Sequence, residues 1–231
     1  MKKGTTLIIA SLLIAAGIFF LGIFIKSGID NMAFRDRQVT VKGLAEREVE
    51  ANRVTWPIQY SVAGDDLLSL YDQVTRYNAK IFNFLTTNGI DKSEISINPP
   101  DTYNATTNQY SSGNFRYNYS LTCNVTVTTS KVAKVRELLD RQSELLKEGI
   151  PYSNSYINYE YTALNDIKPA MIAEATKNAR EAAAQFAKDS GSKVGKMKTA
   201  SQGQFSIEDQ SATPFIKKVR VVSTIVYYLE D

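Results

Sequence analysis

Histidine is absent from the 231-residue sequence, and cysteine and tryptophan each occur once. Without histidine the chain cannot build a Ser-His-Asp or Cys-His catalytic arrangement, and it lacks a ligand of the commonest zinc sites. Its glycines are scattered singly, so neither a P-loop nor a GxGxxG motif is present. An enzyme whose base is Lys, Asp or Glu stays open as an alternative. We therefore expect a non-enzymatic protein with no catalytic, cofactor-binding or metal-binding residues and no cofactor.

The single cysteine, Cys123, cannot form an internal disulfide, so cysteine usage indicates neither an oxidising nor a reducing compartment. It lies between Leu121 and Val125 in a strand-like run. This position favours a buried apolar thiol over a reactive one.

The sequence also has no large excess of positive or negative charge, because its formal net charge is only +3. Lys2, Lys3 and Lys26 flank a hydrophobic run near the N-terminus, which leaves the rest of the chain close to neutral. A nucleic-acid-binding surface needs a clustered basic face. We interpret the lysines among residues 193–198 as a solvated strand face, and we expect no nucleic-acid partner.

The hydrophobic run extends from Thr5 to Ile25 without a charge. About 20 such residues, at a rise of about 1.5 Å each, span the hydrocarbon core of a bilayer. We predict a transmembrane anchor over residues 5–26, preceded by a short flank (1–4) and followed by a linker (27–37). The alternative is a cleaved signal followed by secretion, but signal peptides have shorter apolar regions and end at small residues, whereas this run ends in bulky ones.

Strand patterns follow the linker. Val39–Gly43 opens one strand, and apolar residues alternate with polar ones from Val54 to Val62, as in a half-buried antiparallel strand. Pro57 donates no ladder hydrogen bond, so we expect it at an edge or a bulge. Further strands are predicted around Ile95 and over 115–127, which form a hairpin around the polar loop Pro99–Asn114, and over 156–161, 194–201 and 219–229, with a loop over 202–214.

Three amphipathic helices are predicted, over residues 65–88, 132–148 and 167–190. Asp65 or Asp66 is expected to cap the first helix, and Gly89 to end it. In the third helix a small residue recurs every four positions, which lets the helix backbone approach its neighbour closely. We interpret this ridge as core packing rather than a binding groove; its helical members are Ala175, Ala179, Ala183 and Ala187. The predicted fold class is α+β, with one domain of mixed or antiparallel sheet and about three helices.

Several of these segments together resemble the SIMPL-domain family. The resemblance spans residues 38–231, although many members have a Pro-Asp pair after the first strand, where this chain has Ala51-Asn52-Arg53. It rests on the opening Val39–Gly43 with Glu48-Val49, the Trp56-Pro57-Ile58 strand, the Ala/Gly ladder through Ala187, Gly191 and Gly195, and the closing Val219–Leu229.

The resemblance implies an α+β domain, usually bacterial and exported to the periplasm or cell surface, whose molecular role is poorly defined. Some relatives assemble into rings or channels, and others are linked to oxidative-stress tolerance or called outer-membrane immunogens. Because positive charges lie on both sides of the hydrophobic run, charge does not orient the chain. The resemblance alone places the domain outside the cytoplasm, on a single-pass inner or cell membrane protein.

Three functional hypotheses remain. The domain self-associates as a homo-oligomer, it binds an envelope protein or polysaccharide as a monomer through the loop Pro99–Asn114, or it is a histidine-free enzyme. Tyrosine is enriched at interfaces, although tyrosines also simply cover sheets. The candidate interface or binding residues are Tyr117, Tyr119, Tyr156, Tyr159 and Tyr161.

Overall fold

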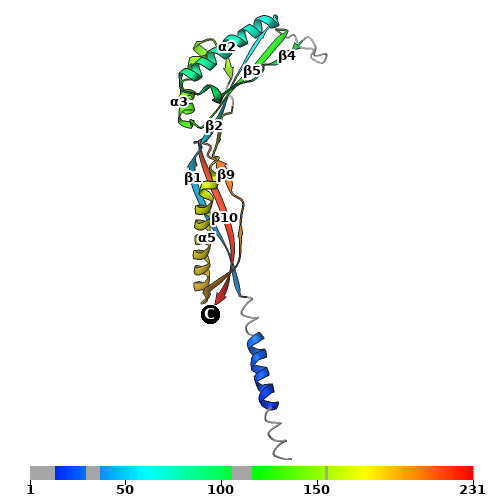
Figure 1. Ribbon diagram of the computed structural model, residues 1–231, viewed down its shortest axis with the longest axis vertical. Helices are drawn as coiled ribbons and strands as arrows, with labels where there is room; N and C mark the ends of the chain where they lie inside the picture. The colour runs from blue at the N-terminus through cyan, green and yellow to red at the C-terminus, as the bar shows by residue number, and fades with distance from the viewer. Residues whose placement is uncertain (1–13, 30–36, 106–115, 154–155, 231) are drawn as a thin grey trace, which may run out of the picture. The chain divides into compact units, whose positions relative to one another are not determined.

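The computed structural model describes residues 14–29, 37–105, 116–153 and 156–230 (Figure 1). The chain divides into two compact units. The predicted α+β class is confirmed, and the strand pairs are antiparallel. The described strands form two sheets, however, and not the single sheet predicted. Unit 1 takes Met1–Arg47, Ile167–Ser206 and Arg220–Asp231, and unit 2 takes Glu48–Asp166 and Ile207–Val219.

The N-terminal helix is described over residues 14–29, and most of its large apolar side chains are exposed. Within the described parts of the chain, no helix combines the length and the apolarity that crossing a membrane requires. The structure therefore gives the predicted span 5–26 no support of its own. Residues 5–13 of that span lie outside the described residues.

Unit 1 is a sheet covered on one face by a long helix, α5 (Figure 1). Its strand order is β1-β10-β8, and β9 also pairs with β10. The predicted small-residue ridge packs into the core, since each of its four alanines is at most 1% exposed. The elements of this sheet and its helix are β1 (Gln38–Glu50), α5 (Leu164–Asp189), β8 (Lys193–Gln202), β9 (Ser206–Asp209) and β10 (Ile216–Glu230). Most of β9 and the beginning of β10 belong to unit 2, since that unit takes Ile207–Val219.

Unit 2 is built around the long antiparallel pair of β2 (Arg53–Gly64) and β5 (Tyr119–Thr129). The predicted alternation in β2 is confirmed, because its apolar residues point into one core with the helices while the polar ones stay partly exposed. The other elements are α2 (Leu67–Thr87), η1 (Lys92–Glu94), β3 (Ile95–Ile97), β4 (Asp101–Asn104), α3 (Val132–Asp140), α4 (Ser143–Lys147), β6 (Tyr152–Ser153) and β7 (Asn158–Glu160).

The residues predicted to start and end the helix α2 do so in the structure. The side chain of Asp66 accepts hydrogen bonds from the backbone nitrogens of Leu68 and Ser69, at 3.2 and 3.3 Å. After the helix, Gly89 has a φ of 93°, a conformation that glycine adopts without steric penalty. The N-cap is thus Asp66, and Asp65 instead accepts a hydrogen bond from the backbone nitrogen of Asn118.

Pro57 lies in β2 between the residues that pair with β7 and those that pair with β6. On one side of β2, β7 pairs with Arg53–Thr55 and β6 pairs with Gln59 and Tyr60. Pro57 therefore lies between two short partner strands, where the missing N–H disturbs no ladder. The predicted edge or bulge is wrong, because β2 is an interior strand of its sheet and its register with β5 is unbroken where Pro57 pairs with Thr126.

Three predicted segments differ from the structure. The helix predicted over 132–148 is two helices, since it is interrupted at Arg141 and Gln142, where the Arg141 guanidinium donates to Asn88 Oδ1 at 2.7 Å and to Glu144 Oε1 at 2.9 Å. The predicted loop Pro99–Asn114 contains the short strand β4, which pairs with β5. The predicted loop over 202–214 contains β9, which pairs with β10. In both cases the long strand supplies backbone partners that local composition does not reveal. Residues 106–115 of the first loop lie outside the described residues.

Candidate ligand-binding pocket

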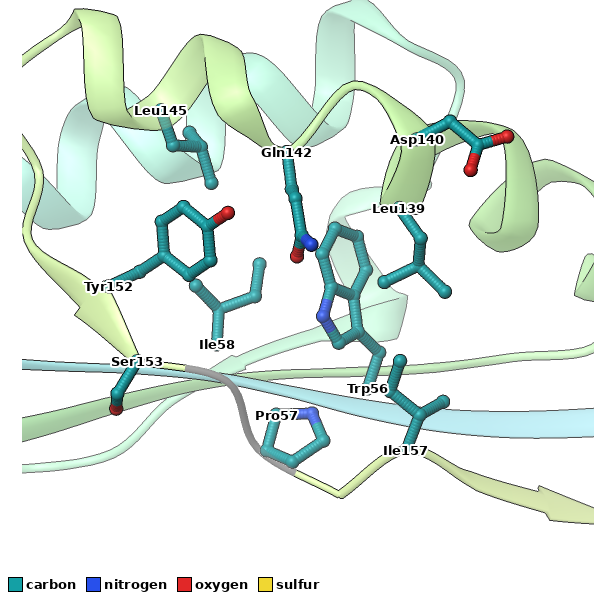
Figure 2. A pocket seen from close by; sticks show the side chains of 10 residues that line it. All are labelled: Trp56, Pro57, Ile58, Leu139, Asp140, Gln142, Leu145, Tyr152, Ser153 and Ile157. Atoms are coloured by element: carbon teal, nitrogen blue, oxygen red, sulfur yellow. The ribbon is translucent and has the colours of Figure 1, made fainter. Parts of the chain in front are cut away.

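A cavity of about 330 Å³ lies in unit 2 between β2, the junction of α3 with α4, and the segment around β6 (Figure 2). Ligand pockets are typically about 300–1,000 Å³, so this cavity suits a small group. Its lining residues are Trp56, Pro57 and Ile58 from β2, Leu139, Asp140, Gln142 and Leu145 from the helices, and Tyr152, Ser153 and Ile157.

Local sequence explains how these side chains meet. The period of two in β2 turns Trp56 and Ile58 to the helix side of the sheet. The interruption between α3 and α4 places Gln142 in the junction itself, directly above the strand in Figure 2. The cavity therefore forms where one helix ends and the next begins.

The cavity has an apolar floor. Trp56, Ile58 and Leu145 are at most 4% exposed, and Leu139 and Ile157 are half-buried beside them. Such a floor favours an apolar group of a ligand, because burying that group removes it from water.

Three polar groups face this floor without a protein partner. Within the described chain, the indole N–H of Trp56, the side-chain amide of Gln142 and the hydroxyl of Tyr152 make no hydrogen bond. In Figure 2 the Gln142 amide and the Tyr152 hydroxyl point toward the space beside the indole nitrogen. Among the described residues these three groups are not counted with the buried polar atoms that lack a partner, so they remain accessible to water. A ligand that carries hydrogen-bonding groups can replace that water.

The rim carries the remaining polar residues. The Ser153 hydroxyl donates to the Gln59 carbonyl at 3.3 Å. Asp140 is exposed, and in Figure 2 its carboxylate points away from the cavity centre. Among the described lining residues, the centre therefore offers neutral donors and acceptors and no charge.

A second cavity of about 510 Å³ lies on the other side of Leu139 and Asp140. There the guanidinium of Arg136 lies 3.6 Å from the ring centroid of Phe215, a cation–π contact. The ring of Phe215 also meets Tyr159 edge-on, with centroids 6.3 Å apart. These polar and aromatic groups already contact one another, so the second cavity makes a weaker binding site than the first.

A family model, described as SIMPL, protein of unknown function (DUF541), matches residues 39–226. The chain belongs to the SIMPL family. The match includes residues of both compact units and therefore confirms the resemblance seen in the sequence. A search of curated proteins gave no match.

The five candidate tyrosines of this SIMPL chain do not form one surface. Tyr119 pairs with Gly64 and Tyr159 with Val54, at opposite ends of β2. Tyr117 and Tyr156 are 41% and 75% exposed, whereas Tyr119 and Tyr161 are half-buried.

Tyr159 requires a correction. It is only 7% exposed, because the alternation of the short strand β7 turns its ring into the core against Phe215. Burial raises the pKa of its hydroxyl, and the neighbouring Arg136 partly opposes that rise. Tyr159 therefore stabilises the core of unit 2 and is not an exposed interface residue.

Sequence reasoning missed Gln142 and Tyr152 and treated Trp56 only as a strand residue. The one available signal was that Trp56 is the sole tryptophan of the chain. Nothing in local periodicity brings the α3–α4 junction over β2. In the described residues no group of three or more His, Cys, Asp or Glu side chains is placed to hold a metal ion.

Edge strand β8 offers a different kind of surface. All of its residues are exposed or half-buried, and its described ladder partner is β10 on one side. The part from Lys193 to Lys198 carries three lysines and two register irregularities, which discourage the addition of another strand. The part from Thr199 to Gln202 pairs regularly with β10 and is uncharged.

Proposed function

We propose that this SIMPL chain is a non-enzymatic binding module of the cell envelope, and that the cavity beside Trp56 holds one unit of an envelope polysaccharide. The observation that supports this proposal most is a set of three polar groups above an apolar floor, on Trp56, Gln142 and Tyr152, which have no hydrogen-bond partner among the described residues. Sugar units combine apolar C–H surface with neutral hydroxyl groups and therefore match both parts of the cavity.

The same cavity favours binding over glycoside hydrolysis. Most glycosidases place two carboxyl groups on either side of the scissile bond. Of the described residues that line the cavity, Asp140 alone is acidic, and its carboxylate points outward. This arrangement supports a binding role.

The proposal includes a membrane tether at residues 5–26, with the following units outside the cytoplasm. It is supported by the uncharged run Thr5–Ile25 and by the exposure of bulky side chains such as Phe19 and Phe24, at 68% and 74%. Apolar side chains that are exposed among the described residues suit a hydrocarbon environment. Protease added to spheroplasts should degrade the chain beyond the tether, and full protection would overturn this placement.

Co-sedimentation of the full chain in lipid nanodiscs with purified insoluble cell-wall sacculi tests the binding function. Ser153→Trp introduces a bulky ring at the cavity rim, and Ser130→Trp places the same ring at an exposed turn that does not line the cavity. We expect the wild type and Ser130→Trp to sediment with the sacculi, and Ser153→Trp to remain largely in solution. Equal sedimentation of both variants, or no sedimentation of the wild type, would refute the function.

Self-association is a second candidate, favoured by the exposed and regular edge from Thr199 to Gln202. An open edge presents backbone groups to which another strand can add. Light scattering of the full chain in nanodiscs or detergent, corrected for the lipid or detergent, should give a multiple of the subunit mass. Thr199→Lys should reduce that mass, while Thr40→Lys on the exposed side of β1 serves as control. A single subunit mass for the wild type would exclude this candidate.

A further inference from the structure

We infer that the cavity beside Trp56 recognises the acetamido group of an N-acetylated amino sugar. The inference rests on the proposed function and names the chemical group that the same site selects. It follows from the kinds of hydrogen-bonding groups in the cavity, from the absence of charge at its centre, and from its apolar floor.

The hydrogen-bonding groups fit an amide. The indole of Trp56 is a donor only, so it needs an acceptor such as the acetamido carbonyl. The side chain of Gln142 offers both a carbonyl acceptor and an amide donor, and its carbonyl can accept from the acetamido N–H. An acetamido group can thus accept a hydrogen bond from Trp56 and donate one to Gln142 through two different atoms. A single sugar hydroxyl would have to make both hydrogen bonds through one oxygen atom.

The apolar floor accounts for the methyl group. Ile58 and Leu145 are 2% and 1% exposed and line the cavity below the polar groups. A methyl group placed against them leaves water, which stabilises the complex. A free amino sugar lacks this methyl group and carries a positive charge, for which the cavity centre has no opposite charge.

The rim accounts for the sugar ring. Ser153 adds a hydroxyl oxygen at the opening, and the Tyr152 hydroxyl faces the space inside it (Figure 2). A bound sugar can place ring hydroxyl groups where these oxygens accept hydrogen bonds from them. An N-acetylated peptide end has no comparable set of hydroxyl groups, so the rim favours a sugar.

Intrinsic fluorescence tests the inference directly, because Trp56 is the sole tryptophan of the chain and lines the cavity. The full chain in nanodiscs is titrated with N-acetylglucosamine, glucose, glucosamine and N-acetylalanine methylamide. We expect a saturable change with N-acetylglucosamine and affinities at least about tenfold weaker for the other three, since each lacks the acetamido group or the sugar ring.

Two variants check the named contacts. Gln142→Leu keeps the side-chain size but removes the amide, and Tyr152→Phe removes only a hydroxyl. Each should weaken N-acetylglucosamine binding about fivefold, the effect of one lost hydrogen bond. Gln185→Leu on α5 is the control, because this exposed glutamine lies in unit 1 and bonds only to Asp189 among the described residues.

The outcomes separate the inference from the function on which it rests. Unchanged N-acetylglucosamine affinity in both pocket variants would overturn the inference, as would equal binding of glucose or of the acetylated peptide. If no sugar alters the fluorescence while Ser153→Trp still abolishes sedimentation with sacculi, the acetamido assignment is wrong and the binding function stands. If Ser153→Trp binds sacculi normally, the function itself is wrong.

Discussion

Gly43 of β1 lies directly against the backbone of α5 at Ala179. A Cβ atom at Gly43 would approach the Ala179 nitrogen to 2.5 Å, and the carbonyl oxygen of Ala175 more closely still. The small residues on the helix and the glycine on the strand together permit this contact. The ridge of alanines is thus matched by a second small residue, from a segment more than a hundred positions earlier in the chain.

Gly43→Ala should therefore destabilise unit 1 by about 3 kcal/mol or more, because the added methyl group meets rigid backbone and a packed interior cannot absorb it. Thermal or urea unfolding of the full chain measures the loss. Gly28→Ala is the matched control, since a Cβ there meets nothing within 4 Å. Equal stability of the two variants would show that β1 and α5 do not pack this closely.

Lys217 and Asp209 form an ion pair in which the lysine side chain is 3% exposed and the carboxylate 50%. Asp209→Asn leaves the buried ammonium without its counter-charge, so we expect a loss of about 1–2 kcal/mol after screening at the half-exposed partner. Lys217→Met should cost less, because it removes the buried charge and leaves Asp209 hydrated. Comparing their unfolding free energies tests this order, and a larger loss for Lys217→Met would contradict it.

The same pair predicts a pH dependence. The hydrogen bond from Lys217 and its positive charge hold the pKa of Asp209 below the ordinary value, with a smaller contribution from the Tyr156 hydroxyl. A lowered carboxyl pKa contributes stability that is complete above the unfolded value, about 3.9, and is lost as the pH falls through the folded value. The difference in melting temperature between wild type and Asp209→Asn should therefore shrink below about pH 4. A difference that grows in acid would refute the pairing.

Cys123 should react slowly with alkylating reagents in the folded chain. The residue is 1% exposed, and burial raises the pKa of its thiol, so the reactive thiolate is scarce near neutral pH; a hydrogen bond with Tyr60 offsets part of this rise. Iodoacetamide labelling followed by mass spectrometry should be at least about a hundredfold faster in urea than in buffer. Rapid labelling of the native chain would mean that this part of unit 2 opens readily.

Asp66→Ala should destabilise unit 2 by about 1 kcal/mol, because the N-terminal N–H groups of α2 lose the acceptor that now binds them. Chemical unfolding gives the value. Asp72→Ala, at an exposed position within α2, is expected to change stability by only a few tenths of a kcal/mol. If the two substitutions are equivalent, Asp66 contributes no cap.

Much of the fold could be predicted because its signals are local. The alternation in β2 is evident in the sequence from Val54 to Val62, and the cap and stop of α2 depend on Asp66 and Gly89 alone. The short strands β4 and β9 could not be predicted in the same way, because each exists through pairing with a distant long strand. The interruption at Arg141 likewise coincides with a contact to Asn88, which periodicity does not reveal.

By itself, the sequence determined the α+β class, the absence of histidine chemistry and the small-residue ridge of α5, since composition and periodicity encode these directly. The order of its quoted segments carried the SIMPL resemblance. The tertiary structure alone decided that Tyr159 is buried, that the strands divide between two sheets, and that Trp56 meets Gln142 and Tyr152 around one cavity. The cavity residues come from segments about 100 positions apart. Their approach depends on how the helices pack on the sheet, a long-range effect that no local pattern contains.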